Sequence, residues 1–408
     1  MRTLLPLPCS LALLLPCSLA PLAAQVAIRG ETVYTMAGDP IRDGIVLIGR
    51  DGRIERVGPA ASVRVPSGYR ELTARVVTPG LVDAHTVVGL AGYLNQPHDQ
   101  DQLETSDVMQ PELRAFDAYN ARERLVTWVR QFGTTTMHTG HGPGALMSGQ
   151  TMVVRTTGNN VGEALMDSVT MIAMTLGPEV AQNFTNRPGT RARGVALVRA
   201  EFIKAQDYAR RMGDRDASRR PARDLGMDIL VQVLDREVKV LITAQRVSEI
   251  LAALRLQQEF GFDLVLDGAA EAYLVLDEIK RAGVPVIIHP TMARHGGTLE
   301  NATFRTAAVL DSAGIRFAFQ TGYEGYVPKT RVLLFEVAQA VPYGLSMTSA
   351  LRAATIDAAR ILGVEARVGS LERGKDGDVV LFDGDPFEYT THVCGVVIRG
   401  QVVSERCW

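Results

Sequence analysis

The middle of the chain alternates between short apolar runs and longer segments that carry apolar residues at helical spacing. Strands that are buried on both faces read as continuous apolar stretches, as in parallel sheets covered by helices. The region from about residue 75 to about residue 363 therefore predicts a parallel α/β barrel. Its clearest expected elements are strands at 133–138, 238–243, 262–268, 284–289 and 315–322 and helices at 117–131, 248–260 and 271–282.

Both ends of the chain are instead rich in short strand-like segments. Residues 44–48 and 51–58 alternate between apolar and polar positions around an Asp-Gly turn, which is typical of a hairpin. Residues 377–383 and 396–403 repeat this pattern near the other end. Two strand-rich pieces around an α/β segment predict one small β-domain built from both termini. We therefore divide the chain after a leader into residues 25–74, 75–365 and 366–408.

Residues 1–24 have the pattern of a secretory signal peptide. Arg2 provides a positive start, residues 11–15 form an apolar centre, and Leu22-Ala23-Ala24 offers a small-residue cleavage site. The segment is too short and too rich in proline for a stable membrane span, although an uncleaved anchor stays open as the alternative. We expect the mature protein to be secreted or periplasmic, with no membrane span after signal removal.

Charge and cysteine content narrow the classes of partner and compartment. The 408 residues carry a formal net charge of -2, which argues against nucleic acid as the main partner. Two of the four cysteines leave with the leader, while Cys394 and Cys407 remain. An oxidising compartment favours a disulfide between them. A symmetric hairpin would place Cys394 opposite Glu405, so a bridge and two free thiols both stay open.

Residues 77–87 read Val-Thr-Pro-Gly-Leu-Val-Asp-Ala-His-Thr-Val, a buried strand that ends on polar side chains. Barrel enzymes present catalytic groups at such strand ends. The stretch resembles the amidohydrolase superfamily, whose first barrel strand reads Pro-Gly-Leu-x-Asp-x-His-x-His, and the chain most resembles the imidazolonepropionase-like branch. Residues 355–363 and 369–378 also match that family. The resemblance implies a TIM-like (β/α)8 barrel of the metal-dependent hydrolase type, with a small β-sandwich built from both termini.

In that family a divalent metal, zinc or iron, lowers the pKa of a bound water and polarises a carbonyl group. By resemblance, only His85 survives of the usual ligands on the strand ends. Val87 stands at the position of the second histidine, and Thr243 and Gly268 stand at two further ligand positions. The strand at 315–322 lacks the aspartate expected as general base. Because a catalytic zinc needs about three protein ligands, we expect the usual chemistry to be absent or much reduced.

Other residues near the predicted strand ends are able to rebuild a site. The candidate metal ligands are His85, His138, Glu179 and His289, and the candidate catalytic acids or bases are Glu324 and Asp267. Four polar or aromatic residues are candidates for a substrate pocket, namely Gln245, Arg246, Tyr323 and Tyr326. The competing interpretation is that these side chains only line or close the barrel.

Two interpretations of the function therefore stay open. In the first, the protein is an enzyme that uses an altered metal site to hydrolyse C–N bonds, other than peptide bonds, in cyclic amides or similar small molecules. In the second, it is a metal-free pseudoenzyme that binds a small-molecule ligand or serves as a partner subunit. By analogy with the family, we expect a homo-oligomer or an association with a paralogous subunit.

Overall fold

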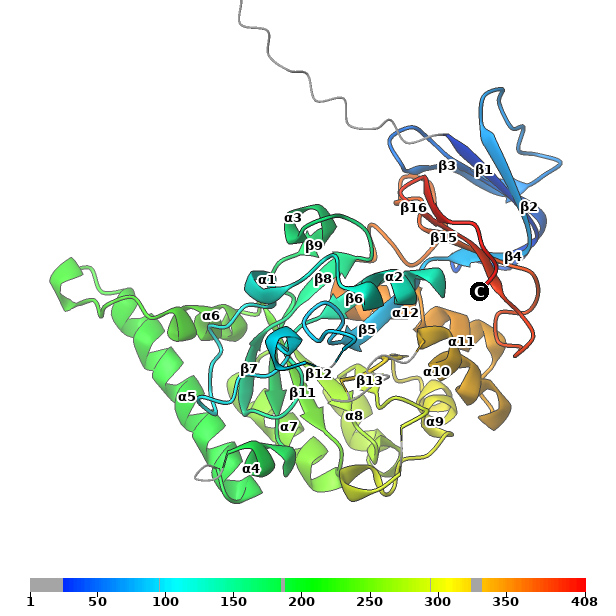
Figure 1. The fold of residues 1–408 in the computed structure, drawn as a ribbon. Coiled ribbons are helices and arrows are strands. Elements are labelled where there is room, and N and C mark those ends of the chain that lie inside the picture. Colours follow the sequence, from blue (N-terminus) through cyan, green and yellow to red (C-terminus); the bar gives the residue numbers. More distant parts are fainter. Residues whose placement is uncertain (1–24, 95, 185–187, 294, 324–331) are drawn as a thin grey trace, which may run out of the picture.

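The computed structural model describes residues 25–94, 96–184, 188–293, 295–323 and 332–408. Strands from both ends of the chain form one seven-stranded sheet (Figure 1). Its order is β17 (Gln401–Ser404), β16 (Val393–Ile398), β15 (Val379–Phe382), β4 (Arg70–Pro79), β1 (Val26–Val33), β2 (Ile41–Ile48) and β3 (Ile54–Pro59). The two terminal regions thus meet in a single sheet between β4 and β15, and the two-layered sandwich stays a prediction.

The middle of the chain forms two further sheets. One contains the mainly parallel strands β14 (Phe317–Ala318), β13 (Val286–Ile288), β12 (Leu264–Gly268), β11 (Lys239–Ala244), β10 (Met171–Thr175) and β7 (Met147–Gln150). The other contains β5 (Leu81–Thr86), β6 (Thr134–Thr139), β8 (Met152–Arg155) and β9 (Leu165–Asp167). Backbone hydrogen bonds join the two sheets at both sides, from Ala84 to Phe319 and from Thr151 to Met171. The predicted mixed α/β fold is confirmed, while a closed eight-stranded barrel stays a prediction.

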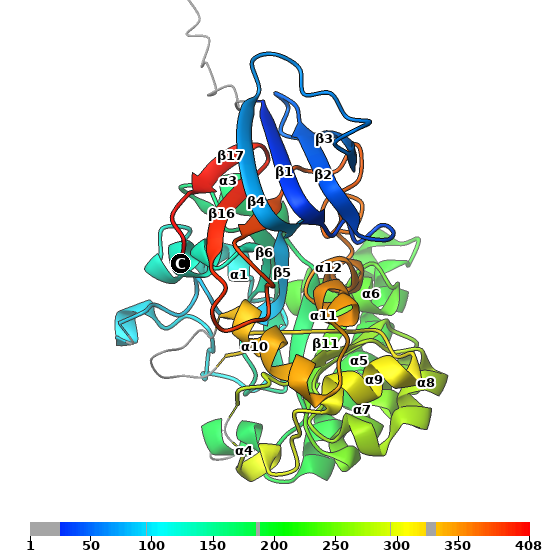
Figure 2. The ribbon, with the colours of Figure 1, turned by 90° about the vertical axis from the view of Figure 1, so that its right-hand side faces the viewer.

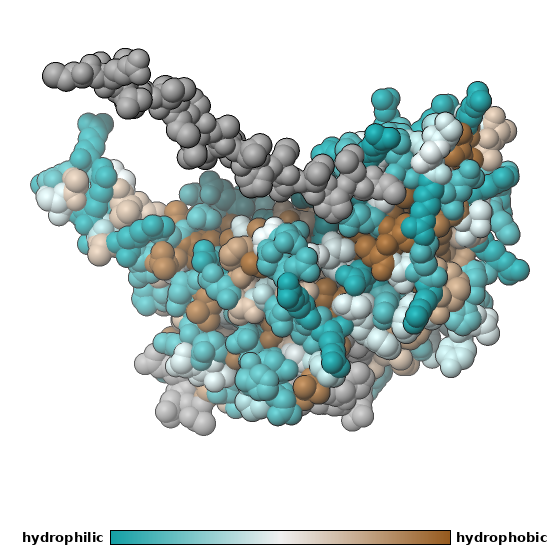
Figure 3. Space-filling model, turned by 45° about the horizontal axis from the view of Figure 1, so that its top comes forward, coloured by the Kyte–Doolittle hydropathy of each residue, from teal (hydrophilic) through white to brown (hydrophobic). Residues whose placement is uncertain are grey.

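Helices cover the outside of these strands (Figure 2). They are α1 (Ala115–Ala118), α2 (Arg124–Gln131), α3 (Val161–Ala164), α4 (Glu179–Asn183), α5 (Arg191–Met212), α6 (Leu225–Leu234), α7 (Val247–Phe260), α8 (Leu276–Ala282), α9 (Thr306–Ala313), α10 (Leu333–Ala340) and α11 (Met347–Ala353). A further helix, α12 (Ile356–Leu362), packs instead against the inward-facing residues of the strands. The far end of α5 projects from the body of the molecule (Figure 1). Within the described ranges, no helix combines the length and the apolar composition that a bilayer crossing requires. The face in Figure 3 is mainly hydrophilic, with scattered apolar patches.

Alternate residues of the parallel strands face two different apolar cores. In β12, Leu264 and Leu266 belong to the large core that the strands share with the surrounding helices, whereas Val265 faces inward. The inner core also contains Ile361 and Leu362 of α12. This two-sided burial explains why the strands read as continuous apolar runs. Because side chains alternate along a strand, the inward-facing apolar residues also determine which residues point into the interior at the strand end.

Cys394 and Cys407 form a disulfide in the structure. The register of β16 and β17 shifts between Val396 and Val397, so the pairing is not the symmetric one that the hairpin pattern suggested. Val393, the first residue of β16, and Trp408, beyond the end of β17, exchange backbone hydrogen bonds. This pairing brings the two cysteines side by side and explains how the slipped hairpin accommodates the bridge.

Candidate functional site

A layer of buried polar side chains lies at the carboxyl ends of the parallel strands. Each follows an inward-facing apolar residue by two positions, so strand alternation turns it inward as well. The members on consecutive strands are Thr243, Asp267, His289 and Gln320, which follow Leu241, Val265, Ile287 and Ala318. The sequence therefore concentrates polar chemistry at one end of an apolar interior.

Asp267 is the centre of this layer. Its Oδ1 accepts a hydrogen bond from Gln320 Nε2 at 2.8 Å and contacts His85 Nδ1 at 3.1 Å. Its Oδ2 accepts a hydrogen bond from Thr243 Oγ1 at 2.6 Å. The carboxylate is fully buried, so these donors replace the water that an ionised carboxylate needs. Protein donors thus occupy both oxygens of Asp267, and its predicted catalytic role stays a prediction.

His85 reaches this network from the end of β5. The register between β5 and β6 shifts between Asp83 and Thr86, an irregularity that accompanies the approach of His85 to Asp267. Burial alone would lower the pKa of His85, but the charge and the hydrogen bond of Asp267 outweigh it, and the pKa is raised. Its Nε2 is buried without a hydrogen-bond partner among the described residues. The His85 ring lies 5.5 Å from the ring of Tyr323, centroid to centroid.

His138 lies beside His85, with 5.7 Å between the ring centroids, but both of its nitrogens are occupied. Nδ1 donates to the carbonyl oxygen of Ala84 at 2.7 Å, and Nε2 lies 2.6 Å from Thr151 Oγ1. Burial, together with the nearby charge of His85, lowers the pKa of His138 to about 3. The ring is therefore neutral and fixed between two strands, with both nitrogens in contact with protein groups.

The other two candidate ligands have separate partners. Glu179, the first residue of α4, accepts a hydrogen bond from Thr298 Oγ1 at 2.7 Å. His289 Nδ1 lies 2.9 Å from the carbonyl oxygen of Pro290. Within the described ranges, no group of three or more histidine, cysteine, aspartate or glutamate side chains is arranged to hold a metal ion. His85 and His138 lie side by side, but Glu179 and His289 do not join them in such a group, and the predicted metal site stays a prediction.

Two of the four predicted pocket residues lie together. Gln245 Nε2 lies 3.4 Å from the hydroxyl of Tyr323, and its Oε1 accepts from the backbone nitrogen of Ala270 at 3.2 Å. The Gln245 side chain fills the space beside Gly268, where an added Cβ would lie 2.3 Å from Nε2. A histidine at position 268 would therefore displace Gln245.

The remaining predictions for the pocket have different outcomes. Arg246 turns outward, and its guanidinium binds Glu300 at 2.6 Å and the carbonyl oxygen of Gly297 at 3.1 Å. It is therefore not grouped with Gln245 and Tyr323, because an acidic partner holds it at the surface. Glu324 and Tyr326 lie outside the described residues, and their predicted roles stay predictions.

Comparison with known proteins identifies the family of the chain. The model of the family described as "Amidohydrolase family" matches residues 76–403, which is most of the chain. The chain belongs to the amidohydrolase family. This result confirms the resemblance that residues 77–87 suggested, and relatives named imidazolonepropionase support that branch.

Three similar proteins show the extent of the likeness. Amidohydrolase tasK of Hapsidospora irregularis is 24% identical over 378 residues, which cover 84% of this chain but only 38% of that protein. Imidazolonepropionase of Sphingopyxis alaskensis is 25% identical over 413 residues, covering 87% of this chain and 91% of that one. A crystal structure of an amidohydrolase from Thermotoga maritima MSB8 is 26% identical, with a TM-score of 0.87, and covers 93% of this chain and 100% of that one.

Sequence reasoning about this family member missed the residues that hold Asp267. The sequence pattern does not single out Gln320, and it indicates Thr243 only as the residue at one of the family's ligand positions. The pattern contained one clue. Both polar residues follow an inward-facing apolar residue by two positions, at the end of an otherwise apolar run. Thr151, the partner of His138, lies between two short strands and had no comparable clue.

Asp83 gives the site a testable pH dependence. Burial raises its pKa from 3.8 to about 7, although hydrogen bonds from Thr321 and His85 oppose the shift. The folded protein therefore holds a proton that the unfolded chain has released, so stability should fall as pH rises from about 4 to about 7. The slope is at most about 1.4 kcal/mol per pH unit.

We expect Asp83→Asn to remove this slope, because asparagine keeps an acceptor for the Thr321 amide and does not titrate. Urea unfolding of both proteins at several pH values measures the effect. Equal slopes for the wild type and the variant would contradict the prediction. Asp117→Asn, at an exposed site beside Arg114, is the matched control.

Proposed function

We propose that this chain is a ligand-binding member of the amidohydrolase family, which recognises a small C–N compound such as a cyclic amide at the strand-end site. We further propose that its altered site does not carry out hydrolysis through the family's usual metal. The protein is then a catalytically silent paralogue. It acts as a single chain, as a homo-oligomer, or as a subunit that associates with a paralogous partner.

The Asp267 network carries this proposal. A metal-binding carboxylate needs free lone pairs, but donors from His85, Thr243 and Gln320 occupy three of the roughly four lone-pair sites of Asp267. The second candidate histidine, His138, has both ring nitrogens engaged. The arrangement therefore resembles a metal site in which hydrogen bonds and an ion pair have taken the place of the ion.

The family relationship supports the proposed class of ligand. The Sphingopyxis relative is named an imidazolonepropionase, and its match extends over 91% of its own length. The unpartnered His85 Nε2 and Gln320 Oε1 are buried polar atoms near Asp267 that a polar ligand is able to satisfy.

We also propose that the mature protein is secreted or periplasmic. The Cys394–Cys407 disulfide supports an oxidising compartment, since such bonds are rare in the cytosol of mesophiles. The signal-peptide pattern of residues 1–24 agrees with this location. The signal segment itself lies outside the described residues.

The comparisons favour a second candidate function, the hydrolysis of a C–N bond in a cyclic amide. This alternative requires metal-coordinating side chains beyond those of the described residues. Glu324, which lies outside the described residues, or a residue of a partner chain would have to supply them. It predicts that the active protein contains a stoichiometric amount of metal, whereas the binding proposal predicts far less.

The deciding experiment measures metal by inductively coupled plasma mass spectrometry after reconstitution with zinc or iron. The same samples are assayed for opening of a panel of cyclic amides. We expect far less than one metal ion per chain and no hydrolysis above that of His85→Asn. Stoichiometric metal, together with turnover that a chelator abolishes and His85→Asn reduces, would overturn the proposal in favour of the hydrolase.

A further inference from the structure

A pocket of about 440 Å³ lies between the segment that follows β10 and the beginning of α5. Its larger apolar lining residues are Leu146, Leu176, Pro178 and Pro188, and most of the remaining lining is glycine or alanine. Ligand pockets of small molecules have volumes of roughly 300–1,000 Å³ and mostly apolar walls. We call this cavity the Arg191 pocket, after the one charged side chain among the described residues that line it.

The Arg191 pocket adjoins the strand-end site. The backbone nitrogen of Leu176 donates to the carbonyl oxygen of Thr243 at 3.1 Å, and the Thr243 side chain binds Asp267. One wall of the pocket is therefore hydrogen-bonded to a residue of the Asp267 network.

Arg191 is held by one edge of its guanidinium. Its Nε lies 3.1 Å from Oε1 of Glu249, whose side chain is buried. The other oxygen of Glu249 accepts from the backbone nitrogens of Gln245 and Arg246 at 3.0 and 3.1 Å, which fixes the carboxylate at the start of α7. The two terminal nitrogens of Arg191 make no hydrogen bond to the described residues, and the side chain is 49% exposed.

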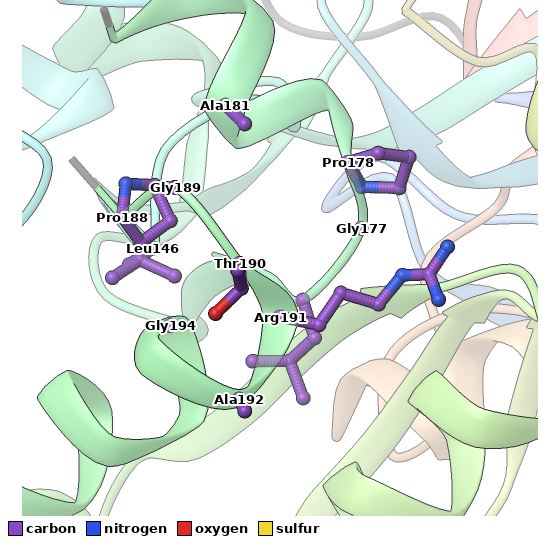
Figure 4. Close-up of a pocket in the computed structure, with 11 residues that line it drawn as sticks. Leu146, Gly177, Pro178, Ala181, Pro188, Gly189, Thr190, Arg191, Ala192 and Gly194 are labelled. Atoms are coloured by element: carbon purple, nitrogen blue, oxygen red, sulfur yellow. The ribbon is translucent and has the colours of Figure 1, made fainter. Parts of the chain in front are cut away.

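The positions of these side chains define two ends of the pocket. Figure 4 shows Arg191 extended past Gly177 and Pro178, with Leu146 and Pro188 at the opposite end. A ligand that spans the pocket therefore meets a planar cation at one end and an apolar wall at the other. A guanidinium edge matches the geometry of a carboxylate, which accepts two parallel hydrogen bonds.

Nearby acidic groups limit the charge of the ligand. The carboxylate of Glu179 lies over Gly177 of the lining, and Glu249 already binds Arg191. A dianion such as phosphate would meet repulsion from both carboxylates, whereas a monoanion meets less.

We propose that the Arg191 pocket binds a small monocarboxylic acid with an apolar body. The carboxylate lies on the free edge of the Arg191 guanidinium, and the apolar body lies against Leu146, Leu176 and Pro188. This site is distinct from the strand-end site, and the inference holds whether or not that site binds a cyclic amide.

Calorimetric titration of the mature protein with hexanoate tests the inference, with hexanamide as the uncharged ligand of the same shape and inorganic phosphate as the dianion. We expect hexanoate to bind in the millimolar range or tighter and to weaken as salt is added. Hexanamide and phosphate should each bind at least about tenfold more weakly, a difference of about 1.4 kcal/mol.

Three variants separate the two ends of the pocket. Arg191→Gln should weaken hexanoate binding at least about tenfold, whereas Arg193→Gln, on the same turn but outside the lining, should leave it unchanged. Ala181→Phe, at an exposed position of the lining, should block binding by filling the cavity.

Several results would overturn the inference. They are no binding of millimolar hexanoate to the wild type, equal affinities in Arg191→Gln and Arg193→Gln, or undiminished binding in Ala181→Phe. Equal affinity for hexanoate and hexanamide would refute the role of the carboxylate. If Arg191→Gln does not fold, the ligand comparison and Ala181→Phe still decide the question.

Discussion

Replacing Asp267 with alanine is expected to lower the free energy of unfolding by about 3–5 kcal/mol, the range for removing one partner of a buried ion pair. The change leaves the charge of His85 uncompensated in the interior and removes the acceptor of Thr243 and Gln320. Each buried donor without an acceptor adds its own desolvation cost. Urea denaturation followed by circular dichroism measures the loss.

Two companion variants separate charge from hydrogen bonding at this position. Asp267→Asn keeps one oxygen acceptor but loses the charge, so we expect an intermediate loss. Asp43→Ala removes an exposed partner of Arg29 and should change stability little, because exposed ion pairs contribute little. If Asp267→Ala unfolds at the same urea concentration as Asp43→Ala, the network does not stabilise the strand ends as we infer.

The order of elements could be predicted from the sequence because local patterns determine it. The apolar runs at 238–243 and 262–268 became β11 and β12 with small changes at their ends. The helix expected at 117–131 begins only at Arg124, because the side chain of Glu123 accepts from the Leu125 backbone nitrogen and caps it there. The apolar pattern continues before residue 124 because Phe116 and Tyr119 pack in the same apolar cluster as Val126 and Val129 of α2.

The chemistry of the site depends on contacts that no local pattern encodes. His85 and Asp267 are 182 residues apart in the sequence, and Gln320 lies 53 residues beyond Asp267. The sequence identified His85 and Asp267 as polar strand ends, but their pairing depends on which strands adjoin and on the register shift of β5. For the same reason, the engagement of both nitrogens of His138 could not be predicted.

The match to the family is compatible with the altered metal site that we propose. The apolar strands and the α12 segment form the inner core, and the chain as a whole is similar in structure to the Thermotoga amidohydrolase, with a TM-score of 0.87. Function depends on the side chains of the site rather than on the fold, so a shared fold does not require a shared chemistry.

Arg155→Met is expected to be as damaging as the loss of Asp267, at a site far from the proposed ligand. Arg155 of β8 binds Asp378 at 2.9 Å and also contacts Asp376, and all three side chains are buried. The two aspartates precede β15, so this cluster links the α/β strands to the seven-stranded sheet. Removing Arg155 leaves the buried Asp378 without its close cationic partner, at a cost of about 3–5 kcal/mol, whereas Asp376 keeps Arg367 at 3.2 Å.

The pH dependence of this loss distinguishes electrostatics from packing. Burial already raises the pKa of Asp378, and Arg155 opposes that rise, so the pKa should increase further in Arg155→Met. A carboxyl whose pKa is raised by folding destabilises the protein at high pH, and protonation relieves the cost as the pH falls through its folded pKa. The loss measured by urea unfolding should therefore be larger at pH 8 than at pH 5, and Arg155→Met/Asp378→Asn should recover part of it. A loss that is the same at both pH values and unaffected by Asp378→Asn would mean that Arg155 acts through packing alone.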